Sequence, residues 1–123
     1  MKRLVIIVFI FSIFITGCGN TKHEKDVFSI TPKEVYKISQ SEDKNKVIID
    51  VRTKEEYVSG HINNAINIPV EEIENIDISK SKEIIVYCRS GRRSYDAANI
   101  LADKGYLVYD MGGINNWTYE LER

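Results

Sequence analysis

Short apolar runs alternate with polar segments along most of this chain. Two of the runs, 47–51 and 83–87, are apolar at nearly every position, as expected for strands that are covered on both faces. The segments between the runs have helical patterns. Strands that alternate with helices predict a parallel sheet with helices on both faces. In such sheets ligands bind at the carboxyl ends of the strands.

The pattern predicts where each element lies. Thr31 and Glu34 have the capping-box spacing that begins a helix, as do Thr53 and Glu56, and Pro32 suits a first helical position. The strands are predicted over 27–30, 47–51, 65–68, 83–87 and 106–109. The helices are predicted over 32 to about 39, 53 to near 60, 70–75 and 93–104, with a last helix that starts at 112–113 and carries Trp117.

The first residues of the chain have a different character. A short basic start is followed by residues 4–15, which are apolar apart from Ser12. A spanning helix needs about 18–20 apolar residues, whereas the core of a signal peptide needs about 7–15. We therefore expect residues 1–17 to be a signal peptide, and residues 18–26, which are mostly polar, to be a tether.

The tetrapeptide Ile15-Thr16-Gly17-Cys18 makes this expectation more specific. An aliphatic residue, two small residues and a cysteine resemble the lipobox of bacterial lipoproteins. The resemblance implies cleavage before Cys18 and a diacylglycerol thioether on its sulfur. The protein would then be anchored at the extracytoplasmic face of a bacterial membrane. An uncleaved anchor and an ordinary cleaved signal are the alternatives.

The number of cysteines and the net charge limit the possible functions of the chain. If Cys18 is acylated, Cys88 has no disulfide partner within the chain. A lone thiol in an exported protein indicates a functional role. Without residues 1–17, the chain has 15 basic and 18 acidic side chains and a net charge of −3. The chain therefore lacks the excess of basic residues that is typical of nucleic-acid binding proteins. We expect a monomer without a cofactor or a metal ion.

The loop after the fourth predicted strand carries the strongest chemical signal. Cys88 follows that strand, Gly91 allows a tight loop, and a helix begins directly afterwards. The thiol would face backbone N–H groups and the positive end of a helix dipole, which favour the reactive thiolate. Arg89, Arg92 and Arg93 add positive charge. The pattern indicates a nucleophile rather than a structural cysteine.

Six motifs follow one another along the chain. They are Asp50-Val51-Arg52, Glu55-Glu56-Tyr57, Gly60-His61-Ile62, Ala65-Ile66-Asn67-Ile68-Pro69, Cys88-Arg89-Ser90-Gly91-Arg92-Arg93-Ser94 and Gly112-Gly113-Ile114-Asn115-Asn116-Trp117. In this order the motifs resemble those of the rhodanese family, the single-domain sulfurtransferases.

The resemblance begins near Phe28, so residues 27–123 are expected to form a rhodanese-like domain. It implies a three-layer α/β sandwich whose central, mostly parallel sheet has about five strands. Many relatives have glycine at the position of Asn64. Asparagine tolerates a left-handed backbone, so we expect the turn to be kept.

The resemblance implies a two-step sulfur transfer. Cys88 would take the outer sulfur of a small anionic donor such as thiosulfate and become a persulfide, which a thiol or cyanide acceptor would empty. Inward-pointing N–H groups of residues 89–93 would stabilise the anion. The cationic side chains would attract the donor, and we favour Arg89 and Arg93 over Arg92 for this contact.

Other motif residues are expected to have supporting roles. The resemblance implies that Asp50 and Arg52 lie beside the catalytic loop and brace it through charge-assisted hydrogen bonds. Glu55 or Glu56 could pair with Arg52. The histidine side chain of His61 could serve as a general base, but sulfur transfer from thiosulfate needs little proton transfer. A histidine that stabilises its turn is therefore the favoured interpretation.

Two other functions use similar residues. Phosphatases and arsenate reductases of this fold need an arginine six positions after the cysteine. Here that position is Ser94 and Arg93 comes one place earlier, so the loop is one residue short. Tyr87 also replaces the histidine that precedes the cysteine in many phosphatases. A rhodanese-like module that only binds a partner usually lacks the cysteine, but a persulfide carrier would keep Cys88 and remains an alternative.

Overall fold

The computed structural model describes residues 26–123, so the predicted signal peptide, Cys18 and the tether up to residue 25 lie outside the described residues. Five strands form one parallel sheet in the order β1-β5-β4-β2-β3. The strands are β1 (Val27–Ser29), β2 (Lys46–Asp50), β3 (Ile66–Asn67), β4 (Glu83–Cys88) and β5 (Leu107–Gly113). The helical elements are α1 (Pro32–Gln40), α2 (Lys54–Ser59), α3 (Arg92–Asp103) and the 3-10 segments η1 (Val70–Asn75) and η2 (Ile114–Asn116).

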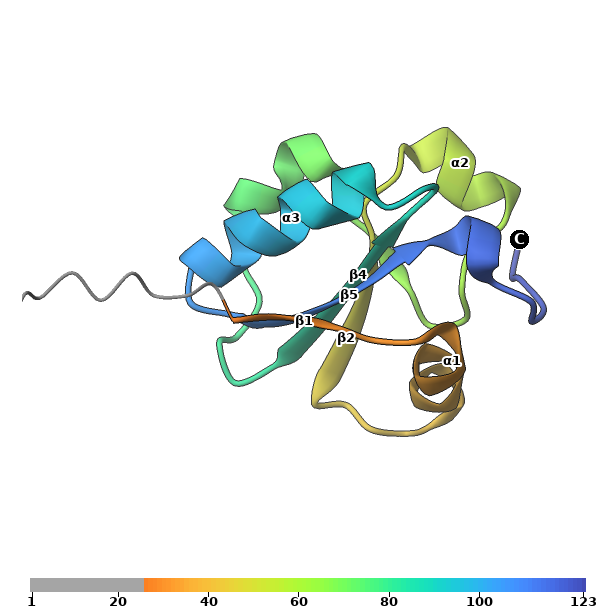
Figure 1. Ribbon diagram of the computed structural model, residues 1–123, viewed down its shortest axis with the longest axis horizontal. Coiled ribbons are helices and arrows are strands. Elements are labelled where there is room, and N and C mark those ends of the chain that lie inside the picture. Colours follow the sequence, from red (N-terminus) through yellow and green to blue (C-terminus); the bar gives the residue numbers. More distant parts are fainter. Residues whose placement is uncertain (1–25) are drawn as a thin grey trace, which may run out of the picture.

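Helices cover both faces of this sheet, as the sequence predicts (Figure 1). Side chains alternate along β4, so that Val86 and Cys88 pack in the core shared with α3 and η1. Ile85 and Tyr87 pack on the opposite face, in the core that includes Val35 of α1. Because both faces are buried, an almost continuous apolar run is required in this strand. The predicted α/β fold is confirmed.

Helix ends follow the local sequence signals. Thr53 and Glu56 form a complete capping box at α2, with each side chain accepting a hydrogen bond from the other residue's backbone N–H. At the end of α3, Gly105 has φ +95. The N–H groups of Gly105 and Tyr106 donate to carbonyls of the last helical turn, which is the Schellman arrangement. Within residues 26–123, no helix has the length and apolar character needed to cross a bilayer.

The end of the chain differs from the prediction. Strand β5 continues to Gly113, so Gly112 and Gly113 belong to the strand and do not begin a helix. The reason is that β4 extends to Cys88 and pairs with both glycines after a register shift at Val86/Tyr87. The predicted last helix is the single turn η2, and Trp117 follows it, partly buried against the core on the α1 face.

Smaller differences concern the bounds of other elements. The predicted strand over 65–68 is only the two-residue β3, and the predicted helix over 70–75 is the 3-10 segment η1. The turn before β3 has Asn64 at φ +66, so the left-handed backbone expected there is confirmed. The side-chain amide of Asn64 donates to the Ser39 carbonyl at 2.7 Å, which joins this turn to the end of α1.

Substitutions at Asn64 separate the two contributions of this residue. Asn64→Ala should destabilise the protein by about 1–2 kcal/mol, because it loses the hydrogen bond and keeps a strained left-handed backbone. Asn64→Gly should cost less, because it loses only the hydrogen bond and relieves the strain. Urea unfolding measures both changes. Equal stability of the alanine and glycine variants would show that backbone strain at this turn is unimportant.

Candidate active site

Cys88 is the last residue of β4 and lies opposite Gly113 of β5 at the carboxyl edge of the sheet. Its side chain is 1% exposed. The N–H of Gly91 donates to the Cys88 Sγ at 3.0 Å. Gly91 has φ +110, a left-handed conformation that turns the chain over the sulfur and directly into α3. The thiol therefore lies beneath a short loop that contributes a hydrogen bond to it.

The loop rests on bare backbone at the end of β5. A Cβ atom added to Gly113 would lie 2.6 Å from the Arg89 carbonyl oxygen and 3.0 Å from the Ser90 Cα. Asn115 of η2 donates its N–H to the same carbonyl at 3.3 Å. A side chain at position 113 would thus displace the loop. The sequence shows the glycine pair but not this contact, which depends on the pairing of β4 with β5.

The other loop side chains divide into exposed and buried groups. Arg89, Ser90 and Arg92 are exposed, and Arg93 is half-buried. Ser94 is fully buried, and its hydroxyl donates to the Gly91 carbonyl at 3.1 Å. Ser94 therefore supports the loop from below, while the arginines surround its outer side.

Arg93 is bound to Glu56 of α2 in a bidentate ion pair. The two oxygen–nitrogen distances are 2.6 Å and 3.1 Å, and the two side chains are 32% and 29% exposed respectively. The hydrogen bond from Arg93 lowers the pKa of Glu56 from 4.5 to about 2, so the carboxylate is ionised at neutral pH. The sequence suggests Arg52 as the partner of Glu55 or Glu56. In the structure Arg52 pairs with Asp50 instead.

Asp50 is a fully buried carboxylate at the end of β2, next to Tyr87 in the sheet register. It accepts hydrogen bonds from the backbone N–H of Arg52 at 2.9 Å and from the Arg52 guanidinium at 2.7–3.1 Å. The Tyr87 hydroxyl donates to it at 2.8 Å. Burial and the Asp50 charge raise the pKa of Tyr87, so the phenol stays protonated and remains a donor.

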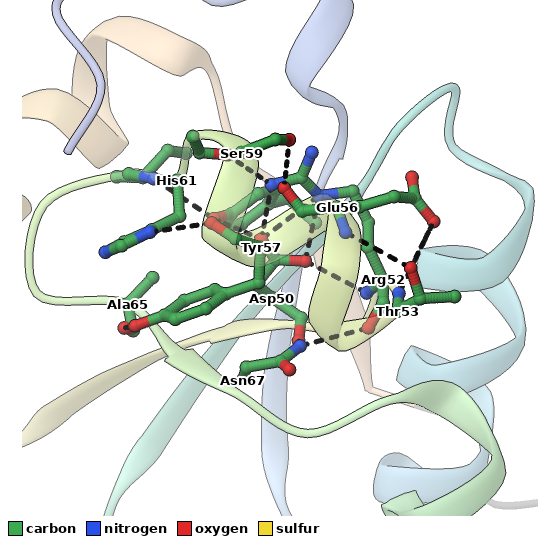
Figure 2. A network of polar contacts seen from close by, with 12 residues as sticks. Asp50, Arg52, Thr53, Glu56, Tyr57, Ser59, His61, Ala65 and Asn67 are labelled. Atoms are coloured by element: carbon green, nitrogen blue, oxygen red, sulfur yellow. Dashed lines mark hydrogen bonds and ion pairs between the residues drawn. The ribbon is translucent and has the colours of Figure 1, made fainter. Parts of the chain in front are cut away.

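The same network reaches the turn between α2 and β3. Arg52 donates to the Gly60 carbonyl at 2.6 Å, and the Tyr87 hydroxyl accepts from the N–H of Ile62 at 3.1 Å. Figure 2 shows Asp50 and Arg52 among their polar contacts, with Asn67 donating to both of their carbonyls. The hydrogen bonds of Asp50 and Arg52 thus brace the strand ends and this turn. Among residues 26–123, these hydrogen bonds are connected to the cysteine loop through Tyr87, the residue before Cys88.

His61 belongs to the same turn. Its ring stacks on Tyr57 with centroids 3.8 Å apart, and its Nδ1 lies 2.9 Å from the Tyr57 carbonyl oxygen (Figure 2). Its Nε2 lies 3.7 Å from a carboxylate oxygen of Glu122. These contacts fit the expected role in stabilising the turn. In the part of the chain from 26 to 123, no group of three or more histidine, cysteine or acidic residues is placed to hold a metal ion.

The fold and the site define the class of protein. It is an α/β domain with a cysteine at the carboxyl end of its central parallel strand, under a short cationic loop. The profile described as Rhodanese-like domain matches residues 31–120, and this chain belongs to the rhodanese family.

Several relatives carry sulfur-related names. The "Putative sulfur carrier protein YrkF" of Bacillus subtilis is 32% identical over 108 residues, which cover 82% of this chain and 58% of that protein. The "Thiosulfate sulfurtransferase PspE" of Escherichia coli is 41% identical over 73 residues, 55% of this chain and 70% of that protein. A rhodanese-like domain protein from Staphylococcus aureus has a crystal structure with a TM-score of 0.67 and 35% identity, covering 77% of this chain and 96% of that one. The match thus spans less than two thirds of the YrkF relative.

Gly113→Ala tests the close contact between β5 and the cysteine loop. Gly113 has φ −96, which alanine adopts freely, so the expected loss of about 1–3 kcal/mol comes from overpacking against the Arg89 carbonyl. The loop should also move, which changes the rate at which iodoacetamide alkylates Cys88. Urea unfolding and the alkylation rate measure the two effects. An alanine variant that matches the wild type in both would contradict the contact.

The Glu56–Arg93 pair should contribute to acid sensitivity. Because the folded-state pKa of Glu56 is about 2 and its ordinary value is 4.5, its contribution to stability is complete above pH 4.5 and disappears as the pH falls toward 2. Glu56→Gln should therefore lose less stability than the wild type between pH 4.5 and 2. Glu55→Gln, which removes an exposed carboxylate from the same helix and keeps the Glu56–Arg93 pair, is the control. If the free energy of unfolding of the wild type and of Glu56→Gln falls equally between pH 4.5 and 2, the stabilising role of this ion pair is refuted.

Proposed function

We propose that this protein is a rhodanese-type sulfurtransferase that works through a persulfide on Cys88. The observation that carries the proposal is the buried Cys88 Sγ, which receives the Gly91 N–H beneath a loop with three arginines. A thiolate there attacks the outer sulfur of thiosulfate or a similar donor. The donor's sulfur–sulfur bond breaks, its electron pair leaves with sulfite, and Cys88 becomes a persulfide anion.

The second step returns the thiolate. A thiol or cyanide acceptor attacks the outer sulfur of the persulfide and takes it away, while the electron pair of the broken bond returns to Cys88. The Gly91 N–H and the amino-terminal end of α3 would stabilise the anionic sulfur in both states. The transferred sulfur keeps the same oxidation level in the donor, in the persulfide and in the product. The proposed reaction therefore needs no redox cofactor.

The geometry disfavours the phosphatase alternative. Phosphatase loops place an arginine six positions after the cysteine, where it would hold a phosphate. Here that position is Ser94, whose fully buried hydroxyl is already bonded to the Gly91 carbonyl. The arginine one place earlier is paired with Glu56. These contacts support a sulfur-sized reacting group over a phosphate.

A persulfide carrier is the second candidate. It is favoured by the relative from Bacillus subtilis, which is named a putative sulfur carrier, whereas the relative from Escherichia coli is named a thiosulfate sulfurtransferase. Both functions load Cys88 with sulfur, and they differ in turnover. An enzyme forms many molecules of thiocyanate from thiosulfate and cyanide, whereas a carrier releases one sulfur to a specific partner and then stops.

We also propose that the protein acts as a monomer on the extracytoplasmic face of a bacterial membrane, held by lipid on Cys18. The support is the apolar run 4–15 followed by the lipobox-like segment. The parallel strands β1 and β4 start at the same edge of the sheet (Figure 1). Strand β1 begins at Val27 on that edge, and β4 ends with Cys88 at the opposite edge. An anchor before β1 would thus join the domain at the edge opposite to Cys88.

Loading with thiosulfate tests the function. The purified full-length chain should gain the mass of one sulfur atom, reductant should remove it, and thiocyanate should form when cyanide is present. Cys88→Ser should abolish the mass gain and the thiocyanate, while Cys18→Ser, the matched control, should keep both. Absence of both products in the wild type would refute a thiosulfate sulfurtransferase, and a single loading without turnover would favour the carrier.

A further inference from the structure

The three arginines of the cysteine loop are not equivalent. Arg93 is held by both oxygens of Glu56, and the pair is only about one-third exposed. Arg89 and Arg92 are exposed, and within residues 26–123 neither forms an ion pair. Their charges are therefore screened by solvent, whereas the half-buried position of Arg93 makes its charge the more effective one.

Arg93 follows the loop that covers Cys88. It is the second residue of α3, at the point where the loop over the sulfur enters the helix. The hydrogen bond with Glu56 raises the pKa of Arg93 most strongly, and electrostatic interactions with Cys88 and Asp50 add to the increase. The cation thus interacts with the carboxylate and with the sulfur, and the carboxylate compensates its charge.

We propose that Glu56 is a specificity-determining residue: by neutralising Arg93 beside Cys88, it favours sulfur donors with one negative charge over dianions such as thiosulfate. The favoured class is organic donors, namely persulfides and thiosulfonates. This inference rests on the proposed sulfur transfer at Cys88. It concerns which donor fills the site and not whether the thiol reacts.

The two donor classes undergo the same reaction with different charge. Thiosulfate brings two negative charges to the thiolate and releases sulfite. Methanethiosulfonate brings one, transfers the same kind of outer sulfur, and releases methanesulfinate with the electron pair of the broken sulfur–sulfur bond. In both cases Cys88 becomes a persulfide anion. A change in local charge should therefore act more strongly on thiosulfate than on methanethiosulfonate.

Alkylation of Cys88 measures the local charge without any sulfur transfer. Iodoacetate is an anion and iodoacetamide is neutral, and both react with the thiolate by releasing iodide. The ratio of their rates reports the electrostatic potential at the sulfur. Glu56→Gln keeps the shape and an acceptor oxygen for Arg93 and Thr53 but removes the charge. It should raise the ratio about two- to fivefold, the size of effect expected for one partly solvent-screened charge near the sulfur.

A double-variant cycle separates charge compensation from positioning. Arg93→Gln leaves Glu56 uncompensated and should lower the alkylation ratio about two- to fivefold. The Glu56→Gln/Arg93→Gln double variant restores the wild-type charge, so its ratio should return to the wild-type value. If Glu56 instead serves only to hold Arg93 in place, Glu56→Gln and the double variant will both fall below the wild type. That result would overturn the proposal.

The donor experiment uses the full-length chain in detergent. Glu56→Gln should raise kcat/KM for thiosulfate about two- to fivefold more than kcat/KM for methanethiosulfonate. Glu55→Gln removes a charge from an exposed neighbouring position. It should change the donor preference and the alkylation ratio less than Glu56→Gln does. An unchanged donor preference in Glu56→Gln would overturn the inference while leaving sulfur transfer intact. If neither donor loads Cys88 in the wild type, the proposed function fails, and the alkylation ratios still report the charge at the site.

Discussion

The buried carboxylate of Asp50 is the constraint on which the edge of the sheet depends. A fully buried negative charge is tolerated only when it is paired and hydrogen-bonded, and here Arg52 and Tyr87 meet that need. Because the two partners also bind Gly60 and Ile62, the carboxylate sets the distance between the ends of β2 and β4 and the turn that follows α2. The position of β4 in turn determines where Cys88 leaves the sheet.

The loop above Cys88 is shaped by backbone contacts more than by its charged side chains. Gly113 lets the Arg89 carbonyl approach β5, Gly91 turns the chain toward α3, and Ser94 closes the loop from beneath. None of these contacts involves an arginine side chain. The charge around the loop can therefore vary without a change in the loop's conformation, and we propose that the ion pair between Glu56 and Arg93 sets that charge.

Much of the fold follows from the sequence, because its signals are local. Apolar runs and capping residues predict the parallel sheet, and they place Asp50 and Cys88 at its carboxyl edge. The pairing of Glu56 with Arg93 joins residues 37 positions apart on different helices, and no spacing rule favours it over a pairing with Arg52. The prediction that a helix begins at residues 112 and 113 was wrong, because glycine suits a close backbone contact as well as a helix start. Only the register of β4 against β5 distinguishes them.

Charge compensation at Arg93 would affect how tightly the site binds and releases anions in the proposed reaction. A strongly cationic site would bind a dianionic donor tightly, but it would also retain the anionic product and stabilise the persulfide against its acceptor. A site whose half-buried cation is paired binds anions less tightly and releases them more readily. Turnover then depends more on the hydrogen bond from Gly91 and the start of α3, which act on the sulfur itself in every state of the cycle. In the proposed reaction, the Glu56–Arg93 pair at the start of α3 would therefore set the selectivity for donor charge, and the backbone would stabilise the reacting sulfur.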